Sequence, residues 1–273
     1  MLSFLDFLRR HRVGVFFALA LSLSWLAFIP YMFTEDGIPW FTFGPAAAAL
    51  IVAAVTGGWR SVKSLLGSIV RWRVNPSWYL AALGLPFLAQ LGSIAINPLF
   101  GAAAPNWSAI PPFAEILPMV ALFAVFSGPL GEEIGWRGYA LPQLLKNHGA
   151  LAASLILGVV WAIWHLPLIL VDDFTSYGAL MPVLAAIVFT WVFQNGRGSV
   201  LLAILMHVSH QNSVRYLSRV YTDGDKVMQQ WLAVGFWLGM VALILSVYGA
   251  RSFTRARSAK QALPIAGATK AGF

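Results

Sequence analysis

Long apolar runs separated by short polar segments dominate this sequence. Eight of them approach or exceed the length needed to cross a hydrocarbon layer about 30 Å thick. The predicted spans are Val13–Phe33, Phe41–Gly57, Trp78–Phe100, Phe113–Ala140, Leu151–Val171, Ala179–Gln194, Val200–Tyr216 and Trp231–Ala250. The sequence therefore predicts an all-α fold, a polytopic membrane helix bundle of about eight transmembrane helices.

The composition supports a membrane protein over a soluble one. Hydrophobic residues make up 59% of the 273 residues and charged residues 10%, against roughly 25% charged in soluble domains. The net charge of +8 does not indicate a nucleic-acid partner, because the basic residues are dispersed between apolar runs and form no single basic face. The chain has no cysteine, which excludes disulfides and thiolate metal sites.

The charges between the spans predict the orientation in the membrane. Lys and Arg concentrate before the first span, in alternate loops and after the last span, whereas the acidic residues concentrate on the other side. Those acidic residues are Glu35, Asp36, Asp172, Asp173, Asp223 and Asp225. By the positive-inside rule both termini are cytoplasmic. We expect a basic N-terminus over residues 1–12, the bundle over 13–250 and a basic, disordered cytoplasmic tail over 251–273.

Three charged residues, Glu132, Glu133 and Arg137, follow directly after the apolar run ILPMVALFAVF. Near the centre of a span they would cost about 8–10 kcal/mol together, and less at a helix end in the interface. Two further spans carry histidines, His165 in one and His207 in the other. Because buried ionisable groups need partners, we favour a shared buried site over an interfacial helix end.

Helical spacing separates the two glutamates. Glu133 and Arg137 form an i, i+4 pair on one helix face, with Glu in the favoured N-terminal position. Glu132 points to another face, where it is available as a general base or acid. In the fifth span, Pro167 cannot donate to the Ile163 carbonyl, so the helix is expected to loosen beside His165.

Three motifs occur in this order: Glu-Glu-x-x-x-Arg (Glu132 to Arg137), Trp-x-x-x-His (Trp161, His165) and His-x-x-x-Gln (His207, Gln211). This pattern resembles the CPBP family of intramembrane proteases, also called Abi, which includes the type II CAAX prenyl endopeptidases and bacterial bacteriocin-processing or immunity proteins. The stretches GEEIGWRGYALPQL and WHLPL look very like its bacterial members. The resemblance covers about residues 113–216.

The resemblance implies peptide-bond hydrolysis within the membrane. Glu132 matches the essential glutamate and His165 the histidine that together would activate water, while His207 and its partner one turn later would stabilise the oxyanion. Members are described both as metalloproteases and as metal-independent, and the set Glu132, His165 and His207 could bind zinc or orient water.

Two positions depart from the family pattern. Trp161 replaces a common phenylalanine, and either ring could pack beside the imidazole. Gln211 occupies the place where asparagine is frequent, with Asn212 next to it, so either residue could complete the last motif.

The resemblance also implies the surroundings of the protein. We expect a multi-pass protein of a bacterial inner membrane, with the lipid bilayer and a membrane-embedded or lipidated protein or peptide substrate as partners. Two other classes stay open: an ion- or proton-coupled transporter that uses the same buried charges as a relay, and a non-catalytic immunity or scaffold protein. Neither explains why the three motifs occur in this order.

Overall fold

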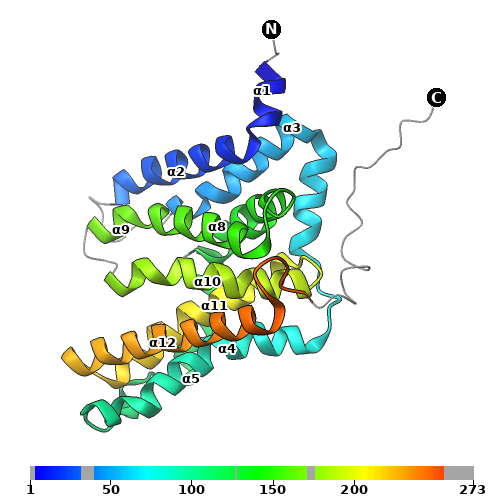
Figure 1. Ribbon diagram of the computed structural model, residues 1–273. Coiled ribbons are helices and arrows are strands. Elements are labelled where there is room, and N and C mark those ends of the chain that lie inside the picture. Colours follow the sequence, from blue (N-terminus) through cyan, green and yellow to red (C-terminus); the bar gives the residue numbers. More distant parts are fainter. Residues whose placement is uncertain (1–3, 32–39, 127, 171–175, 255–273) are drawn as a thin grey trace.

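The computed structural model describes residues 4–31, 40–126, 128–170 and 176–254, and every regular element within these ranges is a helix (Figure 1). The predicted all-α bundle is confirmed. In chain order the elements are α1 (Phe4–Arg10), α2 (Arg12–Tyr31), η1 (Trp40–Phe43), α3 (Gly44–Ile69), α4 (Pro76–Ile96), η2 (Asn97–Phe100), η3 (Trp107–Ala109), α5 (Phe113–Phe126), α6 (Pro129–Glu133), the π-helix η4 (Ile134–Ala140), α7 (Leu141–Leu144), α8 (Ala150–Trp164), α9 (Leu166–Leu170), α10 (Ser176–Asn195), α11 (Val200–Leu217), η5 (Ser218–Val220) and α12 (Asp223–Tyr248).

Helices occupy all eight positions predicted to span the membrane. Within the described residues, six segments are long and apolar enough to cross a membrane by themselves: Arg12–Ile29, Phe41–Ile69, Pro76–Phe100, Phe113–Leu144, Gly178–Asn195 and Asp223–Tyr248. The other two positions are occupied by α8, which has only 15 residues, and by α11, which carries several polar side chains. Both lie within the bundle, where α10 packs against α8 and α11 packs against α4. The chain is therefore a multi-pass membrane protein.

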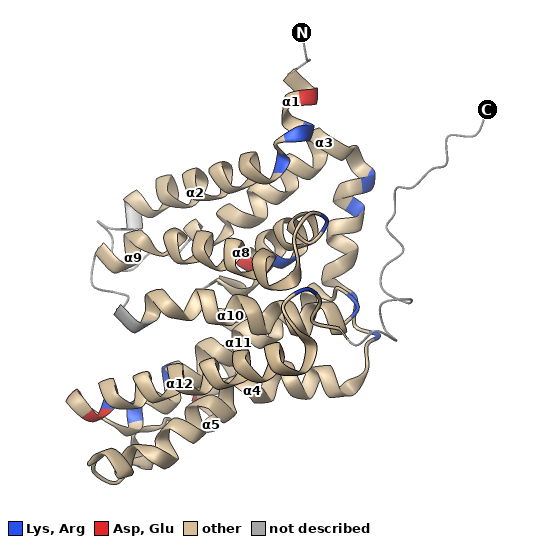
Figure 2. Ribbon diagram, viewed as in Figure 1, with Lys and Arg blue, Asp and Glu red and all other residues tan. Residues whose placement is uncertain are grey.

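The charged residues lie mostly at the two ends of the bundle. Figure 2 shows Lys and Arg around α1, along the later part of α3 and in the connection from α3 to α4. At the opposite end, Asp223 and Asp225 open α12. Arg215, Arg219 and Lys226 flank this start of α12 in the chain, so the separation of charge is incomplete. The orientation with both termini cytoplasmic stays a prediction. Some residues named in the predicted spans, loops and tail lie outside the described residues: Phe33, Glu35, Asp36, Val171, Asp172, Asp173 and the tail from residue 255.

The fourth predicted span, Phe113–Ala140, is not one continuous α-helix. α5 ends at Phe126, and Gly128 adopts a φ of 122° immediately before α6 begins at Pro129. A side chain is disfavoured at this φ, while proline is well suited to the first position of a helix. From Ile134 the backbone changes to π-helical geometry, which continues to Ala140. Glycine and proline thus restart the helix one turn before the two glutamates.

The fifth predicted span is interrupted as well. α8 ends at Trp164, and His165 stands between α8 and the short helix α9 with φ −78° and ψ −4°. The loosening expected beside His165 from Pro167 is confirmed. Both interruptions therefore fall beside residues of the predicted site.

Candidate active site

The segment α6–η4 holds the three charged residues in the interior of the bundle. Glu132 is 3% exposed, and Glu133 and Arg137 are completely buried. α3 packs closely on this segment: a β-carbon at Gly135 would lie 2.5 Å from the β-carbon of Pro45, so only glycine fits without a shift. π-Helical turns are rare and occur frequently at functional sites. The interfacial alternative, in which these charges are hydrated at a helix end, does not fit their burial.

Glu133 and Arg137 form the predicted ion pair. The terminal nitrogen Nη1 of Arg137 donates to Glu133 Oε1 over 2.9 Å. The guanidinium carbon of Arg137 also lies 4.3 Å from the ring centre of Trp161 and 4.4 Å from that of Phe189 on α10. Aromatic faces attract a cation, and more strongly when it is desolvated. A carboxylate and two aromatic rings thus compensate the buried positive charge.

His207 joins this pair from α11. Its Nδ1 lies 2.9 Å from the same Glu133 oxygen, Oε1. Because Glu133 is paired with Arg137 and accepts this bond, Nδ1 of His207 carries the hydrogen and Nε2 faces away from Glu133. Glu133 therefore connects the first and the third sequence motifs.

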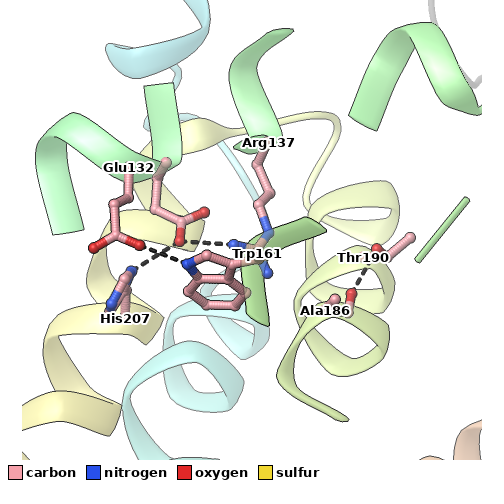
Figure 3. Close-up of polar contacts among 7 residues, drawn as sticks. Glu132, Arg137, Trp161, Ala186, Thr190 and His207 are labelled. Carbon is pink, nitrogen blue, oxygen red and sulfur yellow. Dashed lines mark hydrogen bonds and ion pairs between the residues drawn. The ribbon is translucent and has the colours of Figure 1, made fainter. Parts of the chain in front are cut away.

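Glu132 contacts a different partner. The indole Nε1 of Trp161 donates to Glu132 Oε2 over 2.6 Å (Figure 3). A side chain at Gly128 would collide with the other carboxylate oxygen, Oε1, so glycine leaves space beside that oxygen. The two adjacent glutamates thus occupy different environments, one in an ion pair and one bonded to a neutral donor.

His165 is connected to the same tryptophan. Its Nδ1 lies 2.8 Å from the backbone carbonyl oxygen of Trp161 and donates to it, which leaves Nε2 of the neutral ring as an acceptor. The His165 ring also stands at 90° to the ring of Trp164, with centres 4.8 Å apart. Trp161 therefore bonds to the two residues that the family resemblance assigns to water activation.

α11 is a continuous α-helix through the last motif, from Val200 to Leu217. In regular α-helical geometry, Gln211 lies about 40° from His207 around the axis and Asn212 about 140°. Asn212 is buried and its amide nitrogen donates to the Val208 carbonyl over 2.8 Å, whereas Gln211 is half-buried. The geometry favours Gln211 as the partner of His207, and its contact with an oxyanion stays a prediction.

The candidate metal ligands do not form a metal site in this structure. Among the described residues, no three His, Asp or Glu side chains are placed to hold one ion, and the trio of Glu132, His165 and His207 is no exception. As they are placed here, Glu132, His165 and His207 therefore do not fit a shared metal ion.

Sequence reasoning missed two parts of this site. The Trp161 ring packs beside the His165 imidazole as expected, with ring centres 6.0 Å apart, but the contact of its N–H with Glu132 was not predicted. Phe189, which covers Arg137, lies in an apolar run without any signal that distinguishes it. The first could have been suspected, because a buried indole N–H is a donor that needs an acceptor, and the nearby motifs supply carboxylates.

Known proteins match the part of the chain that builds this site. Residues 114–212, which include every residue of the three motifs, match the family described as type II CAAX prenyl endopeptidase Rce1-like. CAAX prenyl protease 2 of Methanococcus maripaludis is 32% identical over 109 residues, which cover 35% of this chain and 38% of that protein. The match thus spans less than two fifths of the curated relative. The resemblance of this chain to the CPBP family of intramembrane proteases is confirmed for the segment that builds the site.

Proposed function

We propose that this protein is an intramembrane endopeptidase that hydrolyses a peptide bond of a membrane-embedded or lipidated protein. The observation that carries the proposal is the convergence of Glu132, the Glu133–Arg137 pair, His165 and His207 around Trp161, in an otherwise apolar bundle. Charged residues inside a membrane are costly and mark functional sites. The matched family supplies the reaction class, peptide-bond hydrolysis.

In the proposed reaction Glu132 acts as general base. It takes a proton from a water molecule as the water oxygen attacks the scissile carbonyl carbon, and it returns that proton to the leaving nitrogen. Nε2 of His165 is an acceptor that can orient the same water. Within the described residues, Glu133 Oε2 and two guanidinium nitrogens of Arg137 have no protein partner, and buried groups of this kind are commonly satisfied by water.

His207 and Gln211 are the proposed oxyanion donors. A second proton on Nε2 of His207 provides a donor, and the carboxylate of Glu133 on Nδ1 compensates the resulting charge. The Gln211 amide adds a neutral donor from the same helix face. Glu133 and Arg137 do not react in this scheme, and they hold His207 in place.

We propose a lipidated protein as the substrate class, because the matched relative is named a CAAX prenyl protease. The enzyme would act as a multi-pass protein of a bacterial inner membrane with both termini cytoplasmic. The chain would then contact its substrate and the bilayer, without a nucleic-acid partner.

The test compares wild-type protein and Glu132→Gln in lipid nanodiscs, with a farnesylated, internally quenched peptide that ends in Cys and three further residues. We expect wild-type protein to cleave the peptide and Glu132→Gln to be about 10²–10⁴-fold slower with unchanged thermal stability. Glu115→Gln, at an exposed carboxylate near the start of α5, serves as the matched control.

Three other outcomes separate the alternatives. Equal cleavage by wild type and a folded Glu132→Gln variant would contradict the proposed base. Cleavage of the same peptide without the farnesyl group, at the same rate, would remove the lipid requirement and leave the endopeptidase. Proton or ion flux without cleavage would favour the transporter.

A further inference from the structure

Trp161 contacts four residues of the candidate site, Glu132, His165, Arg137 and His207. Its indole N–H donates to Glu132, its carbonyl accepts from His165, its ring face lies against Arg137, and its ring centre is 5.5 Å from that of His207. We propose that Trp161 is a positioning residue whose N–H holds Glu132 Oε2, so that Oε1 is left to receive the proton of the attacking water. This inference rests on the proposed endopeptidase function.

The chemistry of the contact fits this role. The indole nitrogen is a donor only, so a carboxylate bonded to it is favoured in the ionised form that a general base needs. The donor and acceptor are 2.6 Å apart, which is short even for a bond to a charged group, and each residue is 3% exposed. Water therefore competes poorly for this bond.

The tryptophan ring itself is fixed by its neighbours. Phe189 meets it edge-on with ring centres 6.0 Å apart, and the Arg137 guanidinium lies over its face. Phe189 also packs against His207, with ring centres 6.1 Å apart. Any rotation of the indole would disturb these contacts, so the direction of the N–H donor is constrained.

Several other tryptophans bury their indole nitrogen without a protein acceptor among the described residues. Within the described part of the chain, the indole nitrogens of Trp136, Trp164, Trp191 and Trp237 are buried and have no hydrogen-bond partner. Trp161 differs in meeting a carboxylate through its N–H. Its contact with Glu132 is thus a special feature of the site and not a general consequence of burying tryptophan.

The first measurement is the pH–rate profile of Trp161→Phe with the farnesylated quenched peptide. We expect kcat to fall about 10- to 100-fold with little change in KM, because a hydrogen bond to a charged group is lost. The acid limb of the profile should move to higher pH, since the carboxylate loses a donor that favours its ionised form. Replacing Trp161 by β-(3-benzothienyl)alanine keeps the bicyclic ring but removes the N–H. This replacement should lower kcat and move the acid limb in the same way as Trp161→Phe.

Trp237→Phe is the matched control, because it shortens a completely buried indole on α12 that packs against His210 and, among the described residues, makes no contact found with Glu132, His165 or His207. It should keep the wild-type profile. If both Trp161 variants retained wild-type kcat and an unshifted acid limb, Trp161 would only fill space and the inference would be wrong.

A second measurement does not depend on activity. The indole ¹H–¹⁵N resonance of Trp161, assigned by its loss in Trp161→Phe, should move when Glu132 is replaced by Gln. An unmoved resonance would overturn the contact even if the protein is a protease. A moved resonance in a protein that does not cleave the peptide would keep the contact and refute the proposed function.

Discussion

Two buried polar regions of this bundle differ in almost everything except burial. Between α4 and α12, the Gln229 amide nitrogen donates to Gln90 Oε1 over 3.0 Å, and both side chains are nearly inaccessible. Around α6–η4, by contrast, two carboxylates, a guanidinium and two imidazoles are gathered by Trp161 and Glu133. The first region is neutral, whereas the second carries formal charges.

The backbone also differs between the two regions. Gln90 and Gln229 lie within α4 and α12, and each of these elements is one α-helix. Amide pairs of this kind connect membrane helices. The charged region lies where a helix restarts after Gly128, changes to π geometry and faces the break at His165. The candidate active site therefore differs from the amide pair in two ways, in its formal charges and in its irregular backbone.

The largest effect should come from Arg137→Leu. This change leaves the completely buried Glu133 carboxylate without its cation, which costs about 3–5 kcal/mol. We expect loss of folded protein rather than a selective catalytic defect, measured as the thermal unfolding temperature in detergent.

Arg60→Leu, at an exposed arginine on α3, is the control and should change stability by no more than about 0.5 kcal/mol. An unfolding temperature for Arg137→Leu equal to that of wild type would mean that water screens the Glu133–Arg137 pair. The contrast between the two regions would then lose its electrostatic basis.

The next effect concerns the oxyanion donors on α11. Gln211→Ala should reduce the cleavage rate about 10²–10³-fold, because one donor to the developing charge is removed. Asn212→Ala should reduce it much less, since the Asn212 amide nitrogen already donates to the Val208 carbonyl. Gln211→Asn should be intermediate, because the amide is kept on a shorter stem.

A cleavage assay of the three purified variants decides between the two positions. If Asn212→Ala were the inactive variant, the partner of His207 would be Asn212. The helix would then have to change in the enzyme–substrate complex, since its regular geometry here directs Asn212 away from the His207 face.

These cases also show what the sequence could predict. The Glu133–Arg137 contact was predictable, because residues four apart meet on one helix face whatever surrounds the helix. The break beside His165 was predictable as well, since Pro167 removes one backbone donor. The eight helix positions followed from the apolar runs, and six of the described helical segments at these positions are long and apolar enough to cross a membrane by themselves.

Contacts between different helices were harder to predict. The bond between His207 and Glu133 joins residues 74 positions apart and depends on how α11 packs beside α6. The change to π geometry at Ile134 has no evident signal among the residues of that segment. The contact between Trp161 and Glu132 needed both kinds of information: the donor is visible in the sequence, but its acceptor depends on where the bundle places α8 relative to α6.

The smallest effect is expected in the neutral region, and it tests the comparison most directly. Gln229→Leu removes the donor to Gln90 and leaves a buried amide oxygen without that bond, which should cost about 1–3 kcal/mol of stability. The double variant Gln90→Leu/Gln229→Leu removes both polar partners, so its stability should return close to that of wild type.

In both variants the cleavage rate per folded molecule should stay at the wild-type value, because neither glutamine contacts Glu132, Trp161 or a histidine through any hydrogen bond found among the described residues. Rates are measured at a temperature at which each variant is fully folded. A loss of cleavage in the folded double variant would show that the amide pair contributes to catalysis. Charge and irregular backbone would then be insufficient to delimit the site, and the active region would have to extend across α11 to α4 and α12.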